Sequence, residues 1–278
     1  MSDPATPRPA DAGRGVRIVL VRPKIAENVG AAARAMKNFD LADLVLVAPR
    51  TEVNKSAYAL ASHAGDVLEN ARIVPDVDAA LEGVTWALGT SARGRASEAV
   101  REYEVDDALA TLPAEGGALV FGPEDHGLAN DELDRCQALL RIPTAAYASI
   151  NLSQAVNVVA QRWFERRRQA PDLPTPDLAD PVANPAQPAP APREQVERFY
   201  ADLVALWHEI GYTDANREAA TLRLYRGVFD RTTLSVRELA ALRGLVSQAS
   251  WAARLPPDRL PGRAAGADDE DEHADADA

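Results

Sequence analysis

The chain has 278 residues, 46% of them hydrophobic, which suffices for one sizeable core and one smaller module. The single cysteine, Cys136, excludes an internal disulfide, and the four histidines show no ligand spacing, so we expect no structural metal. The net charge of −12 does not exclude a nucleic-acid partner, because seven acidic groups lie in the last eleven residues, whereas residues 14–50 hold seven basic and three acidic groups.

No segment has the pattern of a signal peptide or of a membrane span. Residues 1–14 are rich in Pro, Ala and Asp without an apolar centre, and no later run approaches the roughly 18 apolar residues of a transmembrane helix. We therefore expect a cytoplasmic protein with no membrane partner and a disordered leader over residues 1–15.

Strands and helices alternate through residues 16–168. Apolar runs predict strands at 16–21, 44–47, 71–74, 86–88, 118–121 and 139–142. Apolar residues at helical spacing predict helices at 28–39, 57–61, 77–81, 105–111, 130–137 and 152–168. A loop with Arg93, Arg95 and Arg101 is expected before the fourth helix. This alternation predicts an α/β fold with a mostly parallel sheet, covered on both faces, whose ligand lies at the carboxyl ends of the strands.

The composition changes after residue 168. Eight of the 23 residues at 170–192 are proline, which predicts a semi-extended linker over residues 169–192. Three helical patterns follow, at 194–210, 215–229 and 235–253. The first has one apolar face, made of Phe199, Leu203, Leu206 and Ile210. We expect a small all-α domain at 193–255 and a disordered acidic tail at 256–278.

The loops that follow the predicted strands are candidates for a ligand site. They lie at 24–30, 89–91, 122–127 and 142–151. The first lacks the G-x-G-x-x-G spacing that lets a backbone approach a dinucleotide pyrophosphate, and the chain contains neither a Walker loop nor a G-x-S-x-G elbow. The common enzymes of parallel sheets are therefore poorly supported.

Four motifs stand in these loops and in the helices beside them. They read N-x-G-A-x-x-R-A-M-K-N at 28–38, G-T-S at 89–91, F-G-P-E-D-x-G-L at 121–128 and I-P-x-x-x-x-x-S-I-N-L-S-x-A at 142–155. Together they resemble the SPOUT superfamily of RNA methyltransferases and, within it, the branch that methylates ribose 2′-hydroxyls. The resemblance implies an α/β domain with a C-terminal trefoil knot, S-adenosylmethionine as cofactor, and a homodimer whose site is completed across the interface.

The resemblance also implies which residues bind the cofactor. They are Leu88, Gly89, Thr90, Ser91, Gly122, Ile142, Ser149, Ile150 and Asn151. These residue types suit the task, because adenine needs an apolar slot with backbone donors and acceptors, and glycine lets the chain approach closely. Taken alone, Gly89 and Gly122 equally fit ordinary turns at strand ends.

Arg34 matches the catalytic arginine of the family. An arginine stays protonated near neutral pH, so we assign it to orienting the 2′-hydroxyl and stabilising the developing alkoxide or the adjacent phosphate, before any literal base action. An arginine on a helix surface can instead form a solvated ion pair.

Three further polar residues match the catalytic positions of the family, Asn28, Glu124 and Asn151. Each also has a structural interpretation: Asn28 and Asn151 as helix N-caps, and Glu124 as a buttress of its loop. His126 is interpreted as a loop residue without a role. Asp40, which follows the helix at 28–39, is expected to tolerate a helix-ending turn conformation.

The resemblance is greatest to bacterial tRNA (cytidine/uridine) 2′-O-methyltransferases that modify the first nucleotide of the anticodon loop, nucleotide 32, and that engage tRNA with a helical extension. Candidate RNA contacts are Arg22, Lys37, Arg93 and Arg95. Four arginines of the extension form either a phosphate-facing stripe or a solvated face: Arg217, Arg223, Arg226 and Arg231. Two alternatives remain, a ribose methyltransferase with another tRNA or ribosomal RNA target, and a non-catalytic RNA-binding or assembly factor.

Overall fold

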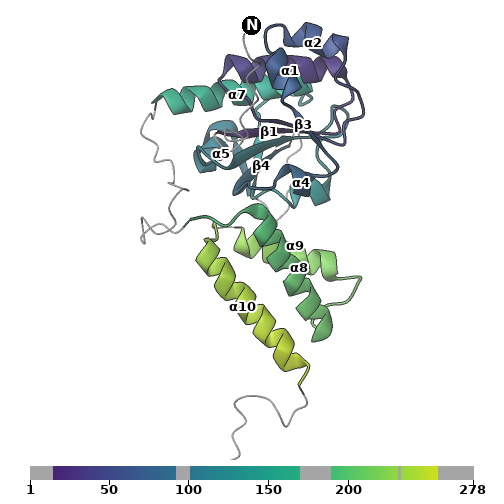
Figure 1. Ribbon diagram of the computed structural model, residues 1–278, viewed down its shortest axis with the longest axis vertical. Helices are drawn as coiled ribbons and strands as arrows, with labels where there is room; N and C mark the ends of the chain where they lie inside the picture. The colour runs from purple at the N-terminus through teal and green to yellow at the C-terminus, as the bar shows by residue number, and fades with distance from the viewer. Residues whose placement is uncertain (1–14, 92–100, 170–188, 231–232, 256–278) are drawn as a thin grey trace, which may run out of the picture.

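The computed structural model (Figure 1) describes residues 15–91, 101–169, 189–230 and 233–255. Its larger part is built on a seven-stranded sheet of order β3-β2-β1-β6-β4-β7-β5, in which every neighbouring pair is parallel. The strands are β1 (Arg17–Val21), β2 (Leu44–Val47), β3 (Arg72–Val74), β4 (Trp86–Thr90), β5 (Arg101–Glu104), β6 (Gly117–Phe121) and β7 (Ala138–Arg141).

The central strands are apolar along their whole length because both faces of the sheet are covered. In β1, Ile18 and Leu20 point into one core, while Val19 and Val21 point into the other, as the two-residue repeat of a strand requires. All four side chains are buried. The continuous apolar runs of the sequence therefore correspond to the most buried strands.

Helices form a layer on each face of the sheet. One face is covered by α1 (Ala26–Asn38), α2 (Lys55–Ala61), α3 (Gly65–Glu69), α5 (Val105–Thr111) and α7 (Leu152–Gln169). The other face carries the shorter α4 (Val77–Ala80) and α6 (Asn130–Leu133). In Figure 1, α1, α2 and α7 lie above the strands and α4 lies below them, on the side of the C-terminal helices.

The smaller part is helical and consists of α8 (Arg193–Glu209), α9 (Glu218–Phe229) and α10 (Val236–Ala253). We call residues 189–255 the helical domain. Its core gathers apolar and aromatic side chains around Phe199, which packs edge-on against Phe229. The segment just before α8 also packs in this core, since Ala191 is buried and its N–H donates to the Leu234 carbonyl at 2.7 Å. None of the described helices is long and apolar enough to cross a bilayer.

The α/β class, the parallel sheet and the all-α C-terminal part agree with the predictions from sequence. Two elements were missed: α3, and β5 in the segment interpreted as an arginine loop. The helix predicted at 130–137 was too long, because it ends at Leu133 and a turn leads into β7. Asp40 does adopt a left-handed conformation, with φ of 58°. The trefoil knot stays a prediction.

Candidate cofactor and catalytic site

Three neighbouring strands, β6, β4 and β7, end at the same edge of the sheet. Gly122, Ser91 and Ile142 follow them directly, and a cavity of about 320 Å³ lies between these loops and the start of α7. This volume is within the usual range for small-molecule sites. The structure therefore places a ligand-sized cavity at the carboxyl ends of the strands, where parallel sheets bind ligands.

The cavity has an apolar wall and a polar rim. Four leucines, one from a loop and three from α6, β7 and α7, supply the wall: Leu128, Leu133, Leu140 and Leu152. The rim includes Thr90 and Ser149. Thr90 is fixed by donating its hydroxyl to the Val120 carbonyl at 3.1 Å. An apolar slot beside hydroxyl and backbone groups has the chemistry that an adenosine with a charged tail requires.

Most of the predicted cofactor residues lie on this cavity. Its lining includes Thr90, Ser91, Gly122, Ile142, Ser149 and Ile150. Leu88 and Gly89 are buried behind it, where a Cβ on Gly89 would lie 3.0 Å from Cys136 Sγ. The sequence did not single out the leucine wall, and it discounted His126, which also lines the cavity. An apolar residue of a core and one of a pocket wall look alike in a sequence.

Gly122 is required by a close backbone approach. The loop after β6 folds back, so that a Cβ on Gly122 would lie 2.3 Å from both Gly127 C and Leu128 N. Gly127 assists with a positive φ of 71°, a conformation that glycine adopts without strain. Any side chain at position 122 would force this loop, and with it one wall of the cavity, to move.

The predicted polar residues form one hydrogen-bonded chain. Asn28 Nδ2 donates to Glu124 Oε1 at 2.9 Å, and Asn151 Nδ2 donates to Asn28 Oδ1 at 2.9 Å. Glu124 Oε2 also accepts from the Lys24 N–H at 3.1 Å. Asn151 caps α7 by accepting from the Ser153 N–H at 2.9 Å. This chain ties α1 to the loops around the cavity.

Asn28 is not a helix N-cap, because α1 begins two residues earlier, with Ile25 in the cap position. Its side chain is buried within the polar chain instead. Nearby, Lys24 Nζ forms an ion pair with Asp125, and this hydrogen bond lowers the pKa of Asp125. The segment before α1 and the loop after β6 are therefore joined by two carboxylates.

Arg34 lies outside the cavity, on the exposed face of α1. It lines a second hollow between α1 and α7, with Ser153 and Asn157 on the opposite side. Ile150 borders both hollows. No described residue lies within hydrogen-bond or ion-pair distance of the Arg34 guanidinium, so within the described chain it does not form the solvated ion pair considered from sequence.

Two of the four residues predicted to contact RNA are paired with carboxylates. Arg22 donates to both carboxylate oxygens of the buried Glu132, and Lys37 pairs with Asp66 at 2.6 Å. Arg93 and Arg95 lie outside the described residues.

The described part of the chain has no group of three or more His, Cys, Asp or Glu side chains arranged to hold a metal ion.

A family model described as the SpoU rRNA Methylase family matches residues 15–161, more than half of the chain. The chain belongs to the SpoU methylase family. A second model, described as the C-terminal domain of the tRNA methyltransferase TrmJ, matches residues 194–258. The resemblance recognised in the four motifs is thereby confirmed.

Several proteins of similar sequence align with this chain over most of their own length and most of its length. The tRNA (cytidine/uridine/adenosine-2′-O-)-methyltransferase TrmJ of Pseudomonas aeruginosa is 35% identical over 86% of this chain and 95% of its own. The tRNA (cytidine/uridine-2′-O-)-methyltransferase TrmJ of Photorhabdus laumondii is 34% identical over 85% and 98%. The crystal structure of TrmJ from Z. mobilis superposes with a TM-score of 0.71 and 32% identity, covering 84% of this chain and 97% of that one.

Proposed function

We propose that this protein uses S-adenosylmethionine to methylate the 2′-hydroxyl of a ribose in tRNA, at cytidine or uridine 32 of the anticodon loop. Two adjoining hollows in the structure support this proposal most strongly. One has the size and lining for the cofactor, the other presents Arg34 without a partner among the described residues, and Ile150 borders both. The relatives named as tRNA 2′-O-methyltransferases align over 85–86% of this chain, which supports tRNA as the substrate.

The residues around the first hollow fit the cofactor. The leucine wall suits the adenine, the backbone around Gly122 approaches closely, and Thr90 and Ser149 offer hydroxyls to polar groups. When bound there, S-adenosylmethionine supplies an electrophilic methyl group carried on a sulfonium.

Arg34 acts on the ribose side of the reaction. Its guanidinium donates hydrogen bonds to the 2′-oxygen or the adjacent phosphate, which orients the nucleophile and stabilises negative charge as the hydroxyl proton passes to solvent water. A free guanidinium is suited to this role because no described carboxylate competes for its donors.

Asn28, Glu124 and Asn151 position the two halves of this site. Glu124 lines the cavity and holds Asn28 on α1, and Asn28 holds Asn151 at the start of α7. Because α1 also carries Arg34, the polar chain fixes the helix of the catalytic arginine relative to the cofactor loops. We assign these three residues to positioning rather than to proton transfer.

We also propose a cytoplasmic homodimer in which a second copy covers the hollow between α1 and α7. Small side chains line part of this hollow, Ala31 and Ala35 among them, and allow another backbone to approach. Arg34 lies in this hollow and would then serve a site completed by both copies. Sedimentation of the full chain tests the dimer, and a monomer at micromolar concentration would contradict it.

The proposed activity is tested by methyl transfer from tritiated S-adenosylmethionine to transcribed tRNA. We expect product whose 2′-O-methyl group maps to nucleotide 32, and no product from a matched tRNA with a 2′-deoxyribose there. Product only on ribosomal RNA would contradict the tRNA substrate. Cofactor binding without product on any RNA would favour the non-catalytic RNA-binding factor.

A further inference from the structure

We call the described residues 15–91 and 101–169 the sheet domain. The helical domain is attached to it through the turn after α6. We call residues 134–137 the docking turn. Arg223 on α9 donates hydrogen bonds from Nε and Nη2 to the two carboxylate oxygens of Asp134, over distances of 2.8 to 3.2 Å. Arg226, one helical turn later, donates from Nη1 to the Asp134 carbonyl at 3.4 Å. Two arginines that the sequence placed on a phosphate-facing stripe or a solvated face therefore point at the other domain.

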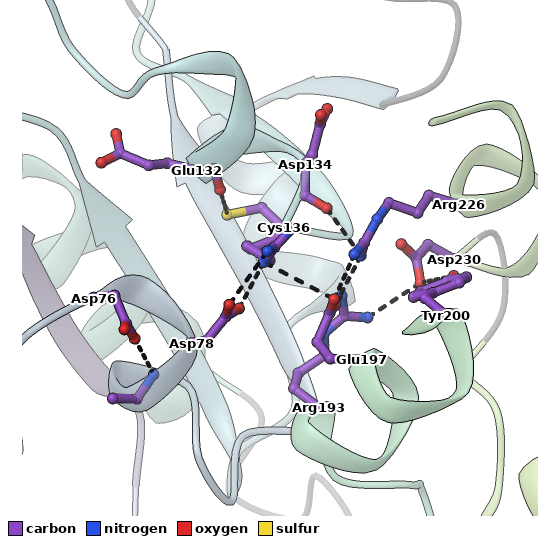
Figure 2. A network of polar contacts seen from close by, with 12 residues as sticks. Asp76, Asp78, Glu132, Asp134, Cys136, Arg193, Glu197, Tyr200, Arg226 and Asp230 are labelled. Atoms are coloured by element: carbon purple, nitrogen blue, oxygen red, sulfur yellow. Dashed lines mark hydrogen bonds and ion pairs between the residues drawn. The ribbon is translucent and has the colours of Figure 1, made fainter. Parts of the chain in front are cut away.

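Behind these contacts lies a buried ionic network, shown in Figure 2. Glu197 on α8 accepts from Arg226 at 2.7 Å and from Arg193 at 2.5 Å, and Arg193 also donates to Asp230 at 3.1 Å. The side chains of Arg226 and Arg193 are only 7% and 4% exposed. Buried charges of this kind hold one geometry, because each needs its partner to offset the loss of water.

The network extends across the domain boundary. Arg135, in the docking turn, pairs with Asp78 at 2.6 Å, and its Nε lies 3.9 Å from Glu197 Oε2. A second attachment lies beside it, where the Arg193 N–H donates to the Val84 carbonyl at 2.7 Å. Because the helical domain is attached at two separate loops of the sheet domain, its orientation relative to the sheet domain is fixed.

The opposite side of the docking turn supports the cofactor cavity. Leu133, immediately before the turn, lines the cavity. Gln137 exchanges hydrogen bonds with the backbone of Ala87 on β4, accepting at 2.6 Å through its side chain and donating at 3.0 Å from its N–H. The helical domain therefore binds the docking turn, which directly follows a residue of the cavity wall.

We propose that Asp134, Arg223 and Arg226 are positioning residues, which hold the helical domain at a fixed orientation to the methyl-transfer site so that bound tRNA reaches it. This inference rests on the proposed function. Nε and Nη2 of Arg223 are both bonded to the Asp134 carboxylate, so these donors serve the contact between the domains and are not available to an RNA phosphate. The alignment with the Z. mobilis structure covers 84% of this chain, more than the sheet domain alone supplies, which supports a shared placement of the helices.

Asp134→Asn in the full-length protein separates positioning from RNA contact. If Arg223 positions the domain, the loss of its charged partner loosens the attachment, and KM for tRNA rises about tenfold, equivalent to about 1.4 kcal/mol. The kcat at saturating tRNA and the Kd for S-adenosylmethionine stay within about twofold. If Arg223 instead bound phosphate, releasing it from Asp134 would lower KM or leave it unchanged, and that result would overturn the inference.

Asp202→Asn is the matched control. It removes the same charge beside Arg243, a pair that lies wholly within the helical domain at 3.2 Å, and we expect KM for tRNA within about twofold of wild type. An equal rise in both variants would overturn the inference, since domain attachment would not be the cause. Small-angle scattering gives a readout independent of activity: a larger radius of gyration for Asp134→Asn supports loosened docking even if wild type methylates no tRNA, and an unchanged radius overturns it.

Discussion

Gly30→Ala tests the packing that holds the helix of Arg34 in place. Gly30 lies in the interior of α1, where α2 crosses it so closely that a Cβ would lie 1.9 Å from the Ala57 carbonyl oxygen. A normal contact of this kind is roughly 3.3 Å or more. The two helices must therefore separate by about 1.5 Å, or the substitution cannot be accommodated.

Two effects of opposite sign compete in this variant. Alanine is favoured over glycine in a helix by up to about 1 kcal/mol, which stabilises the fold. Overpacking in a dense core costs about 1–3 kcal/mol or more, and the contacted atoms belong to backbone, which yields less readily than a side chain. We expect the clash to win and the free energy of unfolding to fall by about 1–2 kcal/mol, or a Tm lower by roughly 2–8 °C.

Calorimetric melting of full-length protein measures this effect, and Gly244→Ala provides the matched control. Gly244 also lies inside a helix, α10, but a Cβ there meets no atom within 4 Å. Only the higher helix propensity of alanine acts there, so the free energy of unfolding of the helical domain should rise by up to about 1 kcal/mol. A Tm for Gly30→Ala at or above wild type would refute the close approach of α1 and α2.

Two further predictions concern titratable groups. Burial raises the pKa of Cys136 to about 12, and the side chain is inaccessible, so a thiol reagent at pH 8 should label it only after denaturation; stoichiometric labelling of native protein would contradict this. Burial alone would raise the pKa of Glu197, but the Arg226 hydrogen bond and the charge of Arg193 lower it overall from its ordinary 4.5. A depressed folded-state pKa gives stability that is complete above the ordinary value and lost as pH falls through the folded one. The Tm should therefore drop more steeply below about pH 4.5 in wild type than in Glu197→Gln, and equal pH dependence would count against the network.

The sequence predicted most strands of the sheet, and the loops it proposed for the site lie around the cavity, for a physical reason. Continuous apolar runs such as those of β2 and β6 occur where both faces of a parallel sheet are covered, and the glycines and polar residues that follow them mark the ends at which ligands bind. Short elements were missed where this signal is weak, as in β5, an edge strand of mostly charged residues. The paired residues of each ladder lie far apart in sequence, so strand order needed the structure.

Charged residues were the least predictable from sequence. Arg223 resembles an exposed helix arginine until α9 is placed against Asp134, 89 residues earlier in the chain. Arg22 likewise finds Glu132, 110 residues away. Local spacing carries no information about partners at such separations. The assignment of Arg34 from its motif was of a different kind, because it depended on the family resemblance and not on the chemistry of neighbouring residues.

In the proposed mechanism, one hollow holds the methyl donor while Arg34, in the adjoining hollow, acts on the ribose. The most direct test compares wild type with Arg34→Ala for two quantities, the Kd for S-adenosylmethionine by calorimetry and the methyl-transfer rate at saturating tRNA. We expect an unchanged Kd and a rate lower by about 100-fold or more, as for the loss of one donor to developing negative charge. A retained rate, or a loss of cofactor binding, would contradict it.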